Sequence, residues 1–234
     1  MADIRLRIEL LDTDPLVWRR VVVPETINLH RLHELIQDVM GWEDCHLYEF
    51  ECNGRHYGEP DDLSSLPVAK SRNAKLKALA SRAKDQCLHY LYDFGDGWEH
   101  RIVIEETGLE ETLPCPRWVD GAMACPPEDI GGVYGYTALK AAVAGEEDPY
   151  GQELLQALGG EFPPAVLNEE AIAEALIPFQ AGFMRMEPPH DRVPRSDQGS
   201  PQKAAMERLL KENGIESVEE LLQAIQSRGH QKDD

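Results

Sequence analysis

Residues 92–100 read Tyr92-Asp93-Phe94-Gly95-Asp96-Gly97-Trp98-Glu99-His100, and this stretch decides the fold of the chain. The dipeptide Asp96-Gly97 favours a two-residue hairpin turn, because both residues tolerate the positive φ of a type I′ turn. In that register Asp93 lies opposite His100. Since strand side chains alternate, both then share a face with His89, Leu91, Trp98, Ile102 and Ile104. A carboxylate beside an imidazole on an apolar face is either a buried structural pair or a working site.

Strands are also predicted on both sides of this hairpin. Residues 4–10 alternate between apolar and charged side chains, and residues 18–23 form the returning strand. Residues 46–52 are strand-like again, and the dipeptide Asn53-Gly54 predicts a second tight turn that leads into residues 55–57.

Five helices are predicted, over residues 28–41, 74–84, 137–143, 150–158 and 169–179. The first has Asn28 as its N-cap and Gly41 as its stop. Its residues His30, His33 and Glu34 form a partly solvated face. Residues 113–136, rich in Pro, Gly and Cys, are expected to form a long loop, which is more often functional than idle.

These elements predict an α+β fold, a mainly antiparallel sheet flanked by helices, over residues 1–186. Residues 187–201 have the composition of a Pro-rich linker. Residues 202–234 are predicted to form a C-terminal helical hairpin that is too short to hold a core of its own.

Composition narrows the classes of function. There are 43 acidic and 23 basic residues among 234, a formal net charge of −20, which repels nucleic-acid phosphates and favours cationic ligands. No uncharged run approaches the length of a membrane span, and the N-terminus shows no signal sequence. The five cysteines show no tight pairing. We therefore expect a cytoplasmic protein that binds neither membranes nor nucleic acids.

Several segments together resemble the plasmid pRiA4b ORF-3-like family, small proteins found on plasmids, in mobile elements and in bacterial chromosomes. The segments are Asp14-Pro15-Leu16-Val17-Trp18-Arg19-Arg20, Leu32-His33-Glu34-Leu35-Ile36-Gln37, Met40-Gly41-Trp42, His46-Leu47-Tyr48-Glu49-Phe50, residues 92–100 and Pro126-Pro127-Glu128-Asp129-Ile130-Gly131-Gly132 with Gly135-Tyr136. The resemblance covers about residues 3–180. It implies a compact α+β domain with a mainly antiparallel sheet, and it implies no specific activity. Trp118 stands where relatives often carry a cysteine, which argues against cysteine-pair chemistry here.

The candidate ligand-binding residues are the acids, aromatics and imidazoles of the hairpin, together with two neighbouring groups. The pair Glu128-Asp129 is held between two prolines and two glycines, so these acids either bind a ligand or cap turns. The full candidate set is His46, Tyr48, Tyr92, Asp93, Asp96, Trp98, His100, Glu128 and Asp129.

Three functions are compatible with this set. The first is a binding or adaptor module with an acidic and aromatic cleft for a protein or small-molecule ligand, plausibly a cation, without a cofactor. The second is a metal-assisted hydrolase in which His46, Asp93 and His100 hold a divalent metal such as zinc. The third, a DNA-binding accessory protein of a mobile element, is disfavoured by the net charge. The sequence leaves open whether the protein is an enzyme.

Overall fold

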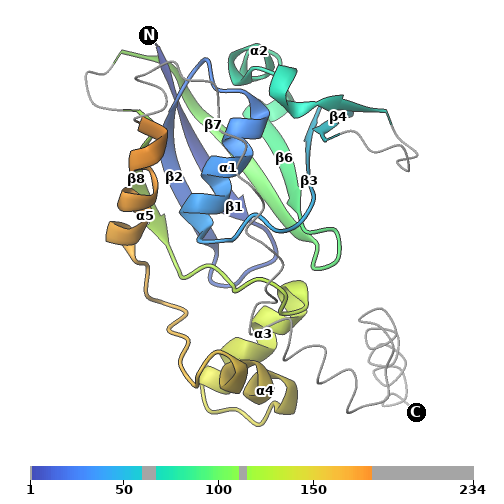
Figure 1. Ribbon diagram of the computed structural model, residues 1–234, viewed down its shortest axis with the longest axis vertical. Helices are drawn as coiled ribbons and strands as arrows, with labels where there is room; N and C mark the ends of the chain where they lie inside the picture. Colours follow the sequence, from blue (N-terminus) through green and yellow to red (C-terminus); the bar gives the residue numbers. More distant parts are fainter. Residues whose placement is uncertain (1, 60–66, 111–114, 181–234) are drawn as a thin grey trace. The chain divides into compact units, whose positions relative to one another are not determined.

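Figure 1 shows a computed structural model of the protein, which describes residues 2–59, 67–110 and 115–180. The described residues form two compact units. The larger unit contains the residues up to 126 and those from 163 onward, and the smaller unit contains residues 127–162. The predicted linker (187–201) and the helical hairpin (202–234) lie outside the described residues, so the domain boundaries proposed from the sequence stay predictions.

An eight-stranded sheet forms the larger unit, in the order β5-β4-β3-β6-β7-β1-β2-β8. Only the β4–β5 pair is parallel, which confirms an α+β fold with a mainly antiparallel sheet. The strands are β1 (Asp3–Leu10), β2 (Val17–Pro24), β3 (Tyr48–Cys52), β4 (Arg55–Gly58), β5 (Val68–Lys70), β6 (Cys87–Tyr92), β7 (Trp98–Leu109) and β8 (Arg117–Ala122).

The helix α1 (Leu29–Met40) lies across one face of this sheet (Figure 1). The side chain of Asn28 accepts a hydrogen bond from the amide of Arg31, and Gly41 ends the helix in the left-handed region, with φ 86°. Both caps confirm the sequence prediction, because Asn satisfies an orphan amide and Gly adopts positive φ without strain. The apolar residues of α1 pack against the buried side chains of the strands, and together they form the core.

Short helices complete the larger unit. They are η1 (Ser71–Asn73), α2 (Leu76–Ala80), η2 (Lys84–Gln86) and α5 (Glu169–Ala175). The helix α5 contacts both α1 and β8. Among the helices that the structure describes, none has the length and apolar character that crossing a bilayer requires.

The smaller unit is a pair of helices, α3 (Gly132–Val143) and α4 (Pro149–Ala157), packed through glycine contacts. A Cβ atom added at Gly135 would lie 1.6 Å from the carbonyl oxygen of Ile130. One added at Gly151 would lie 2.0 Å from the carbonyl oxygen of Ala138. Glycine at 151 therefore lets α4 approach the backbone of α3, and glycine at 135 lets α3 lie close to the segment that precedes it.

The prediction of a continuous loop over residues 113–136 was wrong. This stretch contains β8, which pairs with β2, and the beginning of α3 at Gly132. As an edge strand, β8 has half-buried or exposed side chains throughout. It therefore lacks the apolar alternation by which strands are recognised in a sequence.

Candidate functional site

The hairpin at residues 92–100 has a different register from the predicted one. Tyr92 pairs with Trp98, and residues 93–97 form the loop between them. The amide of Gly97 donates to the carbonyl oxygen of Asp93 at 2.7 Å, and Asp93 adopts φ 54°. His100 therefore pairs with Tyr90 and not with Asp93.

The shift of the register by an odd number of residues moves every side chain of β6 to the other face. Leu88, Tyr90 and Tyr92 now lie in the core with the inward residues of β7, and His89 and Leu91 lie on the opposite face. This arrangement is favoured because two tyrosines and a leucine bury more area than a histidine and a leucine.

His100 is a core residue that is only 1% exposed. Its Nδ1 donates to the carbonyl oxygens of Trp98 at 3.0 Å and Tyr90 at 3.3 Å. Burial lowers the pKa of His100 to about 4, although these two hydrogen bonds act in the opposite direction. The predicted pairing of His100 with Asp93 was wrong, and a group sealed in the core is a poor ligand for a metal that must enter from solvent.

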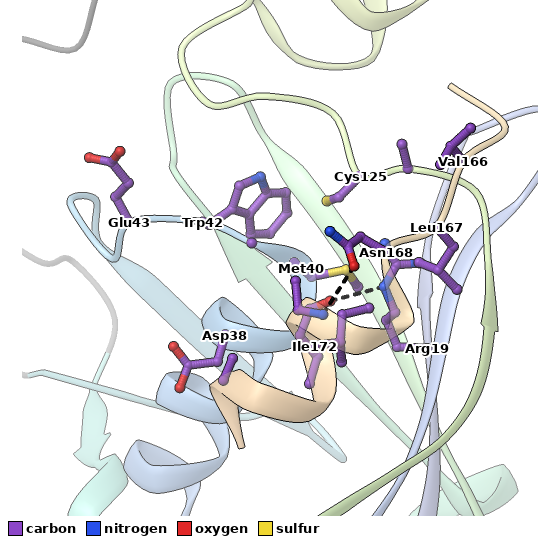
Figure 2. Close-up of a pocket in the computed structure, with 15 residues that line it drawn as sticks. Arg19, Asp38, Met40, Trp42, Glu43, Cys125, Val166, Leu167, Asn168 and Ile172 are labelled. Carbon is purple, nitrogen blue, oxygen red and sulfur yellow. Dashed lines mark hydrogen bonds between the residues drawn. The ribbon is translucent and has the colours of Figure 1, made fainter. Parts of the chain in front are cut away.

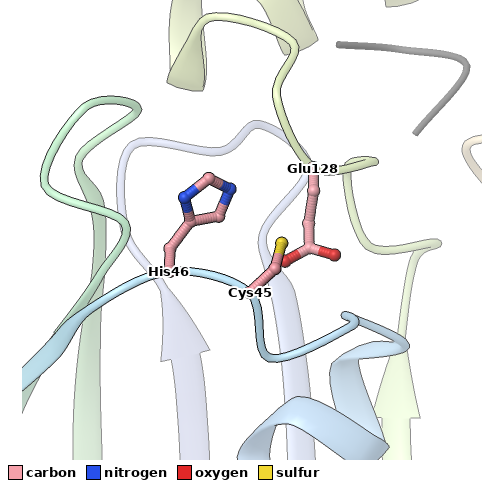
Figure 3. Close-up of side chains that lie close together, drawn as sticks. All are labelled: Cys45, His46 and Glu128. Carbon is pink, nitrogen blue, oxygen red and sulfur yellow. The ribbon is translucent and has the colours of Figure 1, made fainter. Parts of the chain in front are cut away.

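The imidazole that lies beside Asp93 is His46. Its Nε2 is 3.6 Å from Oδ2 of Asp93, while Oδ1 of Asp93 accepts a hydrogen bond from the amide of Gly95 at 2.9 Å. Figure 3 shows His46 next to Cys45 on the segment between α1 and β3. The side chain of His46 is 28% exposed, but its Nε2 is buried and the side chain of Asp93 is only 9% exposed, so the facing atoms of the pair are covered.

The predicted aromatic residues lie in the core. Trp98, Tyr92 and Tyr48 are all buried, so none of them presents its ring as an open wall. The hydroxyl of Tyr92 accepts a hydrogen bond from the amide of Cys45 at 3.1 Å. These rings support the loops beside them, as large aromatics in a core commonly do.

The remaining candidate residues lie at loop positions. Asp96 is half-buried in the 93–97 loop. Glu128 is buried and Asp129 is half-buried in the segment before α3, where Asp129 adopts φ 58°. Such a backbone conformation suits an aspartate in a turn. A ligand-binding role for these acids stays a prediction.

A buried polar network lies beneath α1, where the sequence predicts a partly solvated helix face. Nε2 of His33 donates to the carboxylate of Asp44 at 2.7 Å, and Nδ1 is 2.8 Å from the hydroxyl of Tyr90. Gln37 donates to the same hydroxyl at 2.9 Å. The ionised carboxylate can only accept, so Nε2 carries a proton, and Nδ1 is held at hydrogen-bond distance from the hydroxyl of Tyr90.

The network has a second branch at His30. Nδ1 of His30 is 3.0 Å from the hydroxyl of Tyr48, which is 2.8 Å from Oγ of Ser71. Burial lowers the pKa of His30, and nearby Glu34 opposes this shift. Burial likewise raises the pKa of Tyr48. One signal in the sequence could have revealed this network, because residues 30, 33 and 37 share one helix face at the spacing i, i+3, i+7.

A pocket of about 440 Å³ opens beside the C-terminal end of α1 (Figure 2). Its walls come from α1 and the residues after it, the residues that follow β8, and α5 with the residues before it. The apolar lining consists of Val39, Met40, Trp42, Ala124, Val166, Leu167, Ala171, Ile172 and Ala175. Its volume lies within the usual range for small-molecule sites.

Arg19 builds the inner wall of the pocket. Its Nε donates to the carbonyl oxygen of Val39 at 2.9 Å, and its Nη1 donates to those of Trp18 at 2.9 Å and Ala122 at 3.0 Å. The guanidinium therefore joins the end of α1 to two strands and satisfies a carbonyl group at the helix terminus. This buried hydrogen bonding holds three elements of the pocket together.

Polar groups complete the pocket lining. Asp38 and Glu43 supply two carboxylates, Asn168 caps α5 by accepting from the amide of Ala171 at 3.0 Å, and Cys125 supplies a thiol. Trp42 is fixed by a 2.9 Å hydrogen bond from its Nε1 to the carbonyl oxygen of Pro126. No sequence pattern indicates this pocket, because its walls come from distant parts of the chain.

Comparison with known proteins finds relatives of this chain and the family to which it is similar. A protein of Sinorhizobium fredii (strain NBRC 101917 / NGR234), called uncharacterized protein y4hQ, is 37% identical over 183 residues, which are 78% of this chain and 94% of that protein. The crystal structure of a protein of unknown function, MM3350 from Methanosarcina mazei Go1, is similar with a TM-score of 0.65 and 30% identity. That match covers 73% of this chain and 97% of the other chain.

The family match extends over most of the described residues. The sequence profile of the family described as "Plasmid pRiA4b ORF-3-like protein" matches residues 2–171. This range includes β1 to β8, the polar network and most of the pocket lining. The chain therefore belongs to the plasmid pRiA4b ORF-3-like protein family.

Proposed function

We propose that this protein is a binding module whose ligand site is the pocket beside the C-terminal end of α1. The observation that carries the proposal is an open cavity of about 440 Å³ with a largely apolar lining and two carboxylates. Pockets of this volume, lined by apolar groups with a few polar ones, are typical of ligand sites. As part of the same proposal, the five free cysteines support a cytoplasmic location.

The lining favours a ligand with an apolar body and a positively charged end. Met40 and Ile172 offer apolar contacts, and Trp42 offers the edge or face of an indole. The carboxylates of Asp38 and Glu43 favour an amine or a guanidinium over an acid. The sequence predicts an acidic and aromatic cleft at the hairpin and the Glu128-Asp129 segment, whereas the pocket of this proposal lies elsewhere and contains none of those residues.

A set of three small probes tests the proposed ligand chemistry. Phenylpropylamine, phenylpropanol and phenylpropionate share one apolar body and differ in charge. We expect the amine to bind most tightly and the carboxylate least tightly, measured by ligand-observed NMR and by the intrinsic tryptophan fluorescence of the protein, to which Trp42 contributes. Equal binding of all three probes would contradict the role of the carboxylates.

Variants of α5 test the location of the site. Ala175 lines the pocket, whereas Ala173 is exposed on the same helix and does not line it. We expect Ala175→Trp to fill the cavity and abolish binding of phenylpropylamine, and Ala173→Trp to leave it unchanged. Binding that survives Ala175→Trp in a folded protein would overturn the proposed location.

Variants that remove a charge test the role of the carboxylates in binding without changing the shape of the pocket. We expect Glu43→Gln to weaken the binding of phenylpropylamine by about threefold, which is the size typical of an exposed charge pair. The affinity for phenylpropanol should stay unchanged. The matched control is Glu170→Gln, an exposed acid of α5 outside the lining. An equal loss in both variants would indicate a general effect of net charge.

A further inference from the structure

The sheet has an accessible surface on the face that α1 does not cover (Figure 1). Tyr90 and Tyr92 of β6 are buried in the core, so the alternation of strand side chains places His89 and Leu91 on the opposite face. His89 is exposed and Leu91 is half-buried. Another molecule can therefore reach this outer face of the sheet from solvent.

A groove of about 250 Å³ lies on the outer face. The side chains that line it come from three neighbouring strands, with Glu49 and Glu51 from β3, His89 and Leu91 from β6, and Glu99 from β7. Leu91 pairs with Glu49 on one side and with Glu99 on the other. An apolar side chain thus lies between two acidic residues, all within the larger unit.

The carboxylates of the groove have oxygens that can accept from a ligand. Oε1 of Glu49 accepts from Nδ1 of His56 at 2.7 Å, and Oε1 of Glu51 accepts from the amide of Gly54. Among the described residues, these two carboxylates are engaged through Oε1, and Glu99 is exposed. The groove therefore favours positively charged donors.

Two exposed apolar side chains lie beyond the hairpin end of the groove. Leu47 directly precedes β3 and is 59% exposed, and Phe94 in the 93–97 loop is 56% exposed. The amide of Asp93 donates to the carbonyl oxygen of Leu47 at 3.0 Å, which joins the two segments. Oδ1 of Asp93 accepts from the amide of Gly95 and holds the loop. Aromatic side chains in such a position are enriched at protein interfaces.

The spacing along β3 defines what this surface can recognise. Leu47, Glu49 and Glu51 follow one another at every second residue, so their side chains share a face at intervals of about 7 Å. An extended segment has the same repeat. An apolar residue followed by basic residues at the second and fourth positions after it would therefore match the three side chains in order.

We propose that the outer face is a docking surface for an extended segment of a partner protein with the pattern apolar-x-basic-x-basic. The apolar residue of the segment packs against Leu47 and Phe94, and its lysines or arginines pair with Glu49, Glu51 and Glu99. The segment runs in the direction of β3. This surface shares no residue with the pocket beside α1, so the proposal does not depend on the proposed function.

Three capped pentapeptides test the pattern on the full chain by NMR titration at low salt. Leu-Ser-Lys-Ser-Lys has the proposed pattern, Leu-Lys-Ser-Lys-Ser moves both lysines to the other side of the extended chain, and Leu-Ser-Glu-Ser-Glu reverses the charge. We expect the first peptide to bind at least about threefold more tightly than the second, and the third not to bind. Equal binding of the first two peptides would overturn the proposed pattern.

Variants locate the bound peptide on the protein. The double variant Glu51→Gln with Glu99→Gln should weaken the binding of Leu-Ser-Lys-Ser-Lys by about tenfold, because it removes two charge pairs. Phe94→Ser should weaken it by at least about threefold, because it removes apolar contact area. The matched controls are Glu110→Gln and Ile177→Ser, an exposed acid and an exposed apolar residue outside the groove, which should leave binding unchanged.

The outcomes separate the docking surface from the pocket and from a general effect of charge. Ala175→Trp, which fills the pocket beside α1, should leave binding of the peptide unchanged. Binding that is lost in Ala175→Trp and survives in the groove variants would overturn the proposal. An equal loss from Glu110→Gln and from the double variant would also overturn it, because the peptide would then respond only to net charge.

Discussion

Two histidines of the larger unit each lie beside an aspartate, and they differ in what surrounds them. His33 is 2% exposed, and its two ring nitrogens contact Asp44 at 2.7 Å and Tyr90 at 2.8 Å. His46 is 28% exposed on its side chain and lies 3.6 Å from Asp93. The two imidazoles thus differ in burial and in their distance from the carboxylate, while Asp93, with 9% of its side chain exposed, is more buried than Asp44 with 26%.

The difference shows which of the two imidazoles is tied into the fold by short hydrogen bonds. The buried imidazole has its donor and acceptor satisfied, as the interior requires, and no position is open for another group. In the second pair the imidazole and the carboxylate are 3.6 Å apart, beyond hydrogen-bond distance, and only the imidazole is partly exposed. An imidazole next to a carboxylate therefore indicates a working site only when burial and spacing are known.

The largest effect is expected from removing the buried ring. His33→Leu should lower the free energy of unfolding by about 3 kcal/mol, because it leaves Asp44 and Tyr90 without their hydrogen bonds to the ring. Urea unfolding at neutral pH measures this loss. The matched variant His46→Leu should change stability by less than about 1 kcal/mol. Equal losses in both variants would remove the distinction between the two pairs.

The pH dependence of stability sharpens the comparison through a third imidazole, His100. Burial lowers its pKa from 6.5 to about 4, so the unfolded chain binds a proton more readily than the folded one between these values. The stabilisation that the neutral His100 gives to the folded state is therefore complete above about pH 6.5. It is lost as the pH falls toward 4. We expect His100 to account for a loss of about 2 kcal/mol between pH 7 and pH 5.

Urea unfolding of the unmodified protein, His100→Asn and His89→Asn at both pH values measures this contribution. His100→Asn should flatten the pH dependence, and the exposed control His89→Asn should keep it. A His100→Asn protein with an unchanged pH dependence would contradict a neutral, buried His100.

The smallest effects are expected at the two carboxylates. Asp44→Asn should cost about 1 kcal/mol, because a neutral amide accepts the hydrogen bond from His33 more weakly than a carboxylate does. Asp93→Asn should cost less than about 0.5 kcal/mol, since the amide oxygen still accepts from Gly95. Thermal unfolding of both variants measures the two losses of stability. A larger loss for Asp93→Asn than for Asp44→Asn would contradict a structural role of the His33–Asp44 pair.

The sequence predicted the elements that have local signals. Asn28 and Gly41 cap α1 as predicted, and the Asn53-Gly54 turn joins β3 to β4. In contrast, Asp96-Gly97 has the strongest turn signal and does not form a two-residue turn. The register that buries Tyr90 and Tyr92 is decided by packing against α1, which local turn preferences do not include.

The candidate sites could be predicted only in part. His46 and Asp93 were selected from the sequence and lie side by side. The sequence left open whether His100 is structural or part of a site, and the structure buries it opposite Tyr90 instead of Asp93. The face of α1 with His30 and His33 was taken as partly solvated because polar residues usually face water. In the structure Tyr48 of β3 and Tyr90 of β6 cover this face. Their hydroxyl groups are the hydrogen-bond partners of His30 and His33.

The sequence by itself determined the class of fold, the caps, the family and the acidic surface, because these depend on local preferences and on composition. Only the tertiary structure decided the hairpin register, the burial of His33 and His100, and the pocket beside α1. These features depend on which distant side chains meet, and the free energy of burying them exceeds the preference of any single turn or helix face.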